Sequence, residues 1–137
     1  MRAVRPFLVL LAVSATTCAV AQEFDGSVPL SCKVLGGFDC LPGQPSCGPI
    51  KPESKVEPVY KVNLASKEVD SPFRTAVLKI ASTTSNKESL LLQGTDVASA
   101  WSAIIKKTSG ELTITVADRK GAYVAFGQCQ AAKPAAK

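Results

Sequence analysis

The sequence contains no histidine, and this absence excludes several kinds of active site. A Ser-His-Asp triad or a Cys-His pair needs an imidazole as its general base. Zinc and copper sites that depend on imidazole ligands are excluded for the same reason. Since no catalytic or cofactor-binding motif takes their place, we expect a protein that is not an enzyme and that carries no metal and no cofactor.

The cysteines lack the spacing of the common metal and redox motifs. Cys32, Cys40 and Cys47 are separated by seven and then six residues, and Cys129 lies far downstream. No CxxC pair is present, so the spacing indicates neither a zinc ribbon nor a redox-active pair. We therefore expect these four cysteines to form structural disulfides.

No apolar run is long enough to cross a bilayer, which takes about 20 residues. The run FLVLLAV at residues 7–13 follows two arginines and precedes AVA at residues 19–21. This order is typical of a secretory signal peptide over residues 1–21, cleaved near Ala21, and we expect a periplasmic protein. A lipid anchor at Cys18 is the alternative, although the preceding ATT fits a lipobox poorly.

Cleavage would leave residues 22–137, which is 116 residues and suits a single domain. Four of the five cysteines and 14 of the 16 basic residues would remain, against 11 acidic residues, for a net charge of +3. This mild charge is scattered, so we expect no nucleic-acid partner, and we expect a monomer. We predict one β domain at 22–130, with a loop-rich Cys segment at 22–58, an antiparallel meander at 59–129 and a flexible tail at 131–137.

The pattern of apolar residues predicts β-strands. Residues 27–35 indicate one short strand, interrupted by Pro29, in a segment otherwise rich in proline and glycine. The linkers STTSNK at 82–87, TSG at 108–110 and DRKG at 118–121 read as turns, short enough for antiparallel hairpins. Period-two or short apolar runs that predict strands lie at residues 60–64, 76–80, 90–92, 112–116 and 123–127.

Residues 97–107 fit two structures. As a helix they would start after Asp96, whereas as a strand they would place Trp101, Ala103 and Ile105 on one face. The short turn that follows favours a hairpin, and we expect a strand. The fold class is then all-β: a small antiparallel barrel or sandwich that buries one oily face, with the proline-rich segment across one end.

Four cysteines allow three disulfide pairings. Cys40 and Cys47 flank a short Pro/Gly-rich loop and could close on themselves, which would leave Cys32 to pair with Cys129. That second bridge would close a long loop, worth on the order of 4 kcal/mol in the chain-entropy model. We take this pairing as the hypothesis, with bridges from Cys32 to Cys40 or to Cys47 as the alternatives.

Several short motifs occur along the chain in a recognisable order. They are DGSxPLxC at 25–32, FDC at 38–40, LLQG at 91–94, WS at 101–102, TSGxLTxTV at 108–116 and the ending FGxC at 126–129. Together these motifs resemble a group of small exported proteins of Gram-negative bacteria, and the resemblance implies an exported, β-rich protein and no activity. A looser similarity links the chain to lipocalin-like mini-barrels such as periplasmic lysozyme inhibitors, at the level of the fold alone.

Three hypotheses for function follow. The first is a non-enzymatic binding or inhibitor-like scaffold that presents its surface to a periplasmic protein or a small ligand. The second is a carrier of a small apolar ligand, in which Trp101 and Tyr123 would face the ligand, although aromatic residues in strands more often belong to the core. The third is an enzyme that uses carboxylates alone, which requires two acidic side chains to converge in a cleft. The acidic residues considered are Asp39, Glu88, Asp96 and Glu111.

Overall fold

The computed structural model describes residues 24–52, 56–73 and 77–133, so the predicted signal peptide and the last four residues lie outside the described part. Every helix or strand assigned within these ranges is a β-strand, as predicted. The strands are β1 (Leu30–Cys40), β2 (Gly48–Pro49), β3 (Val59–Asn63), β4 (Glu68–Asp70), β5 (Val77–Lys79), β6 (Ser82–Ser85), β7 (Ser89–Asp96), β8 (Ser99–Lys106), β9 (Glu111–Asp118) and β10 (Gly121–Ala131).

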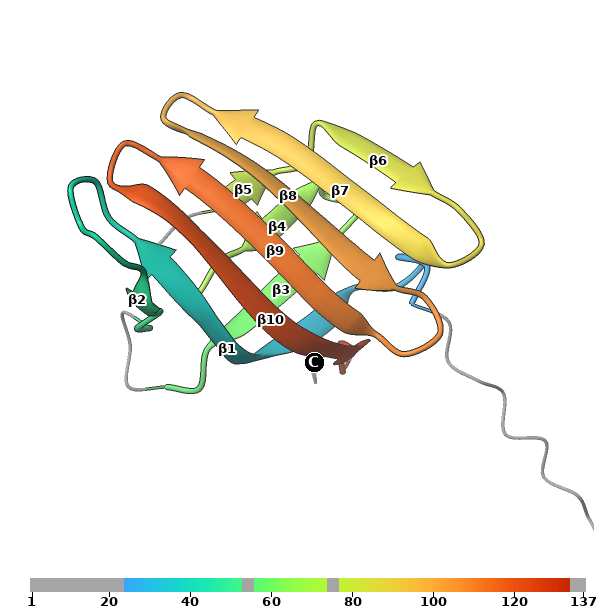
Figure 1. The fold of residues 1–137 in the computed structure, drawn as a ribbon. Helices are drawn as coiled ribbons and strands as arrows, with labels where there is room; N and C mark the ends of the chain where they lie inside the picture. Colours follow the sequence, from blue (N-terminus) through green and yellow to red (C-terminus); the bar gives the residue numbers. More distant parts are fainter. Residues whose placement is uncertain (1–23, 53–55, 74–76, 134–137) are drawn as a thin grey trace, which may run out of the picture.

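The strands form one antiparallel sheet that curls into a half-barrel (Figure 1). Their order is β5-β4-β3-β1-β10-β9-β8-β7-β6, and β2 pairs with β1 off this path. Strands β6 to β10 follow one another as hairpins. The first strand, β1, lies between β3 and the last strand, β10. In Figure 1, β3, β4 and β5 lie behind the layer that β7 to β10 form, so the two layers enclose the core.

Strand β1 is longer than the short strand that the sequence predicts at residues 27–35. It runs for 11 residues because Pro29 precedes it rather than interrupting it. A bulge between Val34 and Gly36 shifts its register on β10. At Gly37 an added Cβ would lie 2.3 Å from the backbone oxygen of Val124, so this close approach requires glycine.

Strand β6 shows that the predicted turn over residues 82–87 was wrong for its first four residues. Residues 82–85 form a strand, and the turn is confined to the residues after it, where the Asn86 Oδ1 accepts from the backbone N–H groups of Glu88 and Ser89 at 2.8 and 2.7 Å. All four side chains of β6 are exposed, so the strand has no apolar face and its sequence shows no period of two.

Residues 97–107 contain strand β8, which confirms the strand prediction over the helical alternative. Trp101, Ala103 and Ile105 are buried on one face, and the residues between them are more exposed. The tight turn into β9 ends at Gly110, which has a φ of 75° and so suits glycine.

The two ends of the sheet meet where β5 continues into β6. The backbone N–H of Ile80 donates to Lys67, beside β4, and the next N–H, that of Ala81, donates to Gln93 of β7, both at 2.9 Å. An added Cβ at Gly94 would lie 1.9 Å from the backbone oxygen of Lys79. Only glycine therefore allows the chain to cross β7 at this corner.

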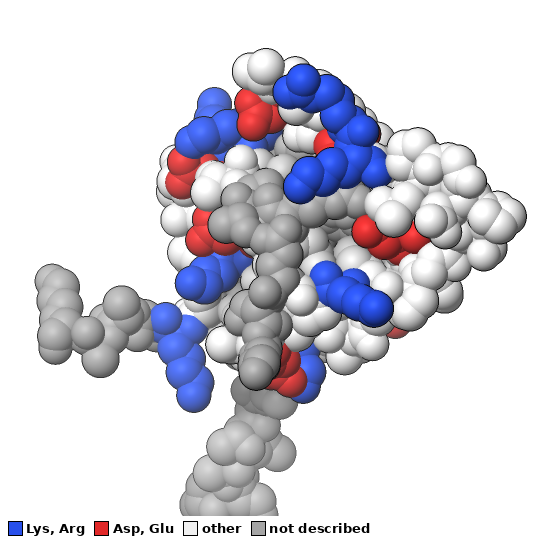
Figure 2. Space-filling model, turned by 90° about the vertical axis from the view of Figure 1, so that its left-hand side faces the viewer, with Lys and Arg blue, Asp and Glu red and all other residues white. Residues whose placement is uncertain are grey.

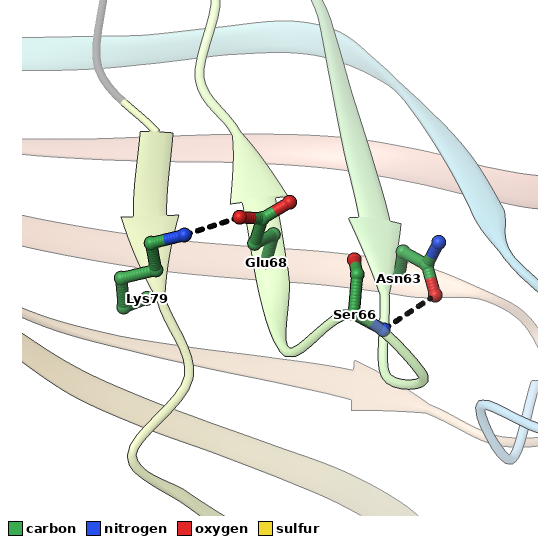
Figure 3. A network of polar contacts seen from close by, with 4 residues as sticks. All are labelled: Asn63, Ser66, Glu68 and Lys79. Carbon is green, nitrogen blue, oxygen red and sulfur yellow. Dashed lines mark hydrogen bonds and ion pairs between the residues drawn. The ribbon is translucent and has the colours of Figure 1, made fainter.

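Figure 3 shows how the β3–β4 hairpin and the neighbouring β5 are held. The Asn63 Oδ1 accepts from the backbone N–H groups of Ala65 at 3.0 Å and of Ser66 at 3.2 Å, which closes the turn. On the adjacent pair of strands, the Lys79 ammonium is ion-paired with Glu68. The exposed end of the sheet at β5 thus carries charged side chains.

Both disulfides have the pairing expected from loop length. Cys32 and Cys129 lie opposite each other on β1 and β10 with a Cα–Cα distance of 3.8 Å, and Cys40 and Cys47 close a short loop at 4.3 Å. The first bridge is buried within the core, while the second lies at the far end of β1. Two such bridges are typical of an oxidising compartment outside the cytosol.

The core lies between the two layers of the half-barrel. Tyr60, Leu92, Ile105 and Ile114 are 0–1% exposed and come from both layers. Phe24 is 8% exposed, and its backbone N–H donates to Lys107 at 2.9 Å, so the start of the described chain covers one end of the core. Each fully buried large aliphatic side chain contributes about 1.5–3 kcal/mol, which makes this core the main source of stability.

Candidate functional site

The side of the sheet that faces away from the core, here called the outer face, includes three rows of side chains that cross β1 and β6 to β10, and the next row along the strands carries Lys106 and Glu111. In antiparallel pairing, residues opposite each other point to the same side of the sheet, so each row is fixed by the register. The rows are Phe126-Thr113-Ile104-Leu91-Thr84, then Phe38-Val124-Thr115-Ser102-Gln93-Ser82, then Cys40-Ala122-Ala117-Ala100-Thr95.

None of the residues in these three rows is charged, and several are large and apolar. Phe38, Ile104 and Phe126 are 52%, 47% and 44% exposed, and Leu35, at the bulge in β1, is 67% exposed. Large exposed apolar groups on neighbouring strands form a contiguous patch rather than scattered contacts with water. Such patches often mark interaction sites.

Two hollows of about 480 Å³ each indent this face. One is floored by small outward side chains, including Ala100, Ala117 and Ala122. The other is bordered by Leu35, Phe126 and other side chains of its row, and Lys106 and Glu111 stand at its rim. Both are open depressions in the sheet surface, suited to apolar side chains of a partner.

Some of the polar groups on the outer face are hydrogen-bonded to one another. The hydroxyls of Ser102 and Thr115 are 2.9 Å apart and share a hydrogen bond between β8 and β9. The Ser82 hydroxyl donates to Gln93 Oε1 at 3.4 Å. These hydrogen bonds could persist if an apolar surface covered this part of the face.

Charged side chains lie towards the ends of the half-barrel. Lys106 is ion-paired with Glu111 where β8 turns into β9, and the hydrogen bond and charge of that ammonium lower the pKa of Glu111 from its ordinary value. Figure 2 shows the end of the half-barrel at the left of Figure 1, where basic and acidic side chains are mixed. The three uncharged rows are therefore bounded by charged side chains.

Trp101, one of the two aromatic residues considered as ligand-facing, is a core residue with 5% exposure. Its indole lies against Gly94, where an added Cβ would be 2.5 Å from Nε1. Among the described residues, this Nε1 is a buried nitrogen without a hydrogen-bond partner. Trp101 is also one of the residues that line the hollow floored by alanines.

Tyr123, the second such residue, is 4% exposed and belongs to a buried group of hydroxyls. Its hydroxyl lies 3.2 Å from the Ser71 Oγ and accepts from the Tyr60 hydroxyl at 3.5 Å. Burial, followed by the neighbouring phenol of Tyr123, raises the pKa of Tyr60 well above its ordinary value. Tyr123 also borders a hollow of about 250 Å³ together with Asp39 and Lys120 at one end of the half-barrel.

These positions bear on the carrier hypothesis. A carrier needs an apolar cavity between the two layers, and Trp101, Tyr123 and Tyr60 instead pack against other core side chains there. The ring of Phe73 packs against both tyrosines, with its centroid 5.9 Å from that of Tyr60 and 5.6 Å from that of Tyr123. The hollows of about 480 Å³ lie on the outer face, outside this core.

The acidic residues considered for catalysis lie on separate elements. Asp39 is in β1, Glu88 in the β6–β7 turn, Asp96 at the end of β7 and Glu111 at the start of β9, where it is ion-paired with Lys106. Within the part of the chain that the structure describes, no three His, Cys, Asp or Glu side chains gather as a metal site would require. The described residues form no helix that is long and apolar enough to span a membrane.

Sequence reasoning did not single out the outer face, although the sequence contains a signal for it. In residues 103–105 and 122–127 the apolar run is unbroken, so side chains on both sides of the strand are apolar. A period of two assigns alternate residues such as Ile105 to the core. It does not explain why Ile104 and Phe126, on the opposite side of the sheet, are also large and apolar. That excess of apolar residues was the available sign of a second apolar surface.

Searches against models of known protein families, curated proteins and solved structures found no match for this chain. The similarity to small exported proteins of Gram-negative bacteria stays a prediction from the short motifs.

Proposed function

We propose that the protein is an exported, non-enzymatic binding protein whose outer face docks a segment of a partner protein. The observation that carries the proposal is the apolar patch around Phe126, Ile104, Leu35 and Phe38, with its two hollows. A partner that fits this patch is uncharged where it makes contact and inserts aromatic or branched aliphatic side chains into the hollows.

The scaffold beneath the face supports this role. β1 and β10, which contribute Phe38 and Phe126, are joined over their length and tied by the Cys32–Cys129 bridge. A face held on paired strands changes shape little on binding, which reduces the entropic cost of association. The disulfides fit an oxidising compartment, and the signal peptide predicted at residues 1–21 would deliver the chain to the periplasm.

The experiment compares the mature protein, residues 22–137, with a variant that carries I104K and F126K. Both side chains point away from the core, so the variant should fold, and two ammonium groups should prevent an apolar partner from docking. The control is V97K, which changes an apolar residue that is 98% exposed in the β7–β8 turn, outside the outer face.

Each protein is used for affinity capture from a periplasmic extract, and a lysozyme-inhibition assay tests the inhibitor form of the proposal. We expect the wild type and V97K to capture the same partner and the double variant to lose it. Equal capture by all three would place binding elsewhere, and no specific capture by the wild type would count against a protein partner.

A further inference from the structure

Within the described part of the chain, strand β6 occupies one end of the strand order and leaves one of its edges open. Among the described residues, the strand that pairs with it is β7. Figure 1 shows β6 at the margin of the layer, with no labelled strand beyond it. All four side chains are exposed. The free edge of a strand presents backbone N–H and C=O groups that can pair with another chain.

The register shows which backbone groups face outward. The Asn86 N–H donates to Ser89 at 3.0 Å, so these two residues form a hydrogen-bonded pair. Hydrogen-bonded pairs alternate along an antiparallel ladder, and Thr84 therefore turns its backbone groups towards β7. Thr83 and Ser85 then present their N–H and C=O groups to the open edge.

Strand β7 supports this assignment independently. The Lys107 N–H donates to Glu88 at 2.8 Å, which pairs this position with the β8 side. The alternate positions of β7, Ser89 and Leu91, are then the ones that bond to β6. Leu91 lies opposite Thr84, as the register requires.

A second copy of the chain matches this edge in one register. A two-fold axis perpendicular to the sheet keeps the outer faces of the two copies on the same side. If Thr84 lies opposite Thr84 of the second copy, then Thr83 lies opposite Ser85 of that copy. Those pairs can exchange both of their backbone hydrogen bonds. The register centred on Thr83 is poorer because it needs the N–H of Ala81, which is already bonded to Gln93.

We propose that the protein forms a two-fold dimer in which β6 pairs with β6 of a second copy, with Thr84 at the axis. The strand sequence is Ser-Thr-Thr-Ser, so like charges do not oppose each other in this pairing, and cross-strand pairs of threonine and serine are favourable. At the other end of the strand order, β5 carries the Lys79–Glu68 ion pair, a charged edge of the kind that discourages pairing.

The short edge sets the strength of the dimer. A strand of 4 residues buries much less area than the roughly 1,600 Å² of a standard protein interface. The dimer should therefore be weak and in rapid exchange, and its population should rise with protein concentration. This differs from the monomer expected from the sequence, in which no pattern reveals an unpaired edge.

A cysteine scan tests the register. Residues opposite each other in a non-hydrogen-bonded pair have Cα atoms about 4.5 Å apart, within the reach of a disulfide. We expect T84C to form a disulfide-linked dimer under mild oxidation. S82C, on the same face but displaced along the strand from its own copy, should stay largely uncrosslinked. Equal crosslinking of the two variants, including none in either, would overturn the proposal.

Sedimentation of the mature protein tests the hydrogen bonds and the axis. T83P removes an N–H that faces the open edge and leaves the β6–β7 ladder intact, so it should raise the dimer dissociation constant about tenfold or more without loss of folding. T84K and T84E alone should be monomers, and their mixture should dimerise. A wild type that remains monomeric at about 1 mM, or a T83P variant that dimerises equally well, would contradict the proposal.

Discussion

Removing the Cys32–Cys129 disulfide should destabilise the protein more than any other crosslink change in the described chain. The bridge joins residues 97 apart in the sequence, and the Cys40–Cys47 bridge joins residues 7 apart. In the chain-entropy model a loop of this longer size is worth about 4.7 kcal/mol and the shorter one about 2.5 kcal/mol. We therefore expect C32A/C129A to lose about 2 kcal/mol more than C40A/C47A.

The packing around the two bridges acts in the same direction. Cys32 and Cys129 are 0% and 2% exposed, so their replacement also leaves space in the core, whereas Cys40 and Cys47 lie near the surface. The assay is urea unfolding of the mature wild type and both double variants. The free energies of unfolding are compared with one common dependence on urea concentration. An equal or larger loss in C40A/C47A would show that neither loop length nor burial governs the contribution of these bridges.

Three further predictions concern single side chains. G94A should destabilise the fold strongly in thermal unfolding because its Cβ would lie 1.9 Å from the Lys79 carbonyl oxygen, whereas G36A, whose Cβ meets nothing within 4 Å, should have little effect. Burial raises the pKa of Tyr60, so the stability linked to its proton is present below about pH 10 and falls as the pH rises further; Y60F should reduce that fall in alkaline unfolding. K79A should let the pKa of Glu68 rise towards its ordinary value in an NMR titration, since the Lys79 hydrogen bond and charge hold it down. The stability from this exposed pair, present above pH 4–5 and lost as the pH falls, should be small.

Strands with one buried face were predictable from the sequence. In β9, Leu112, Ile114 and Val116 are buried and the residues between them face water, so the period of two is explicit. The same alternation in β8, with Trp101 inward, resolved the choice between helix and strand. Loop length was enough to predict both disulfides, because a short Pro/Gly-rich loop left one long-range partner for Cys32.

Strand β6 and the full length of β1 were not predicted from the sequence, for two different physical reasons. β6 is exposed on both sides, so nothing in its composition distinguishes it from a polar turn. β1 contains Gly36 and Gly37, which usually interrupt strands, and the structure uses them at a bulge and at a close contact with β10. Both features depend on what lies beside the strand, which a local pattern does not record.

Of the features described, the apolar outer face is the one that the stability of the fold explains least. Ile104 and Phe126 contribute little to the core because their neighbours Ile105 and Ala125 already fill it. Threonine or lysine at these positions would preserve the sheet, as the adjacent Thr113 and Thr115 show, and would make the surface more soluble. A chain that places large apolar groups there, on strands tied by a disulfide, has a surface better suited to contact with another protein than with water.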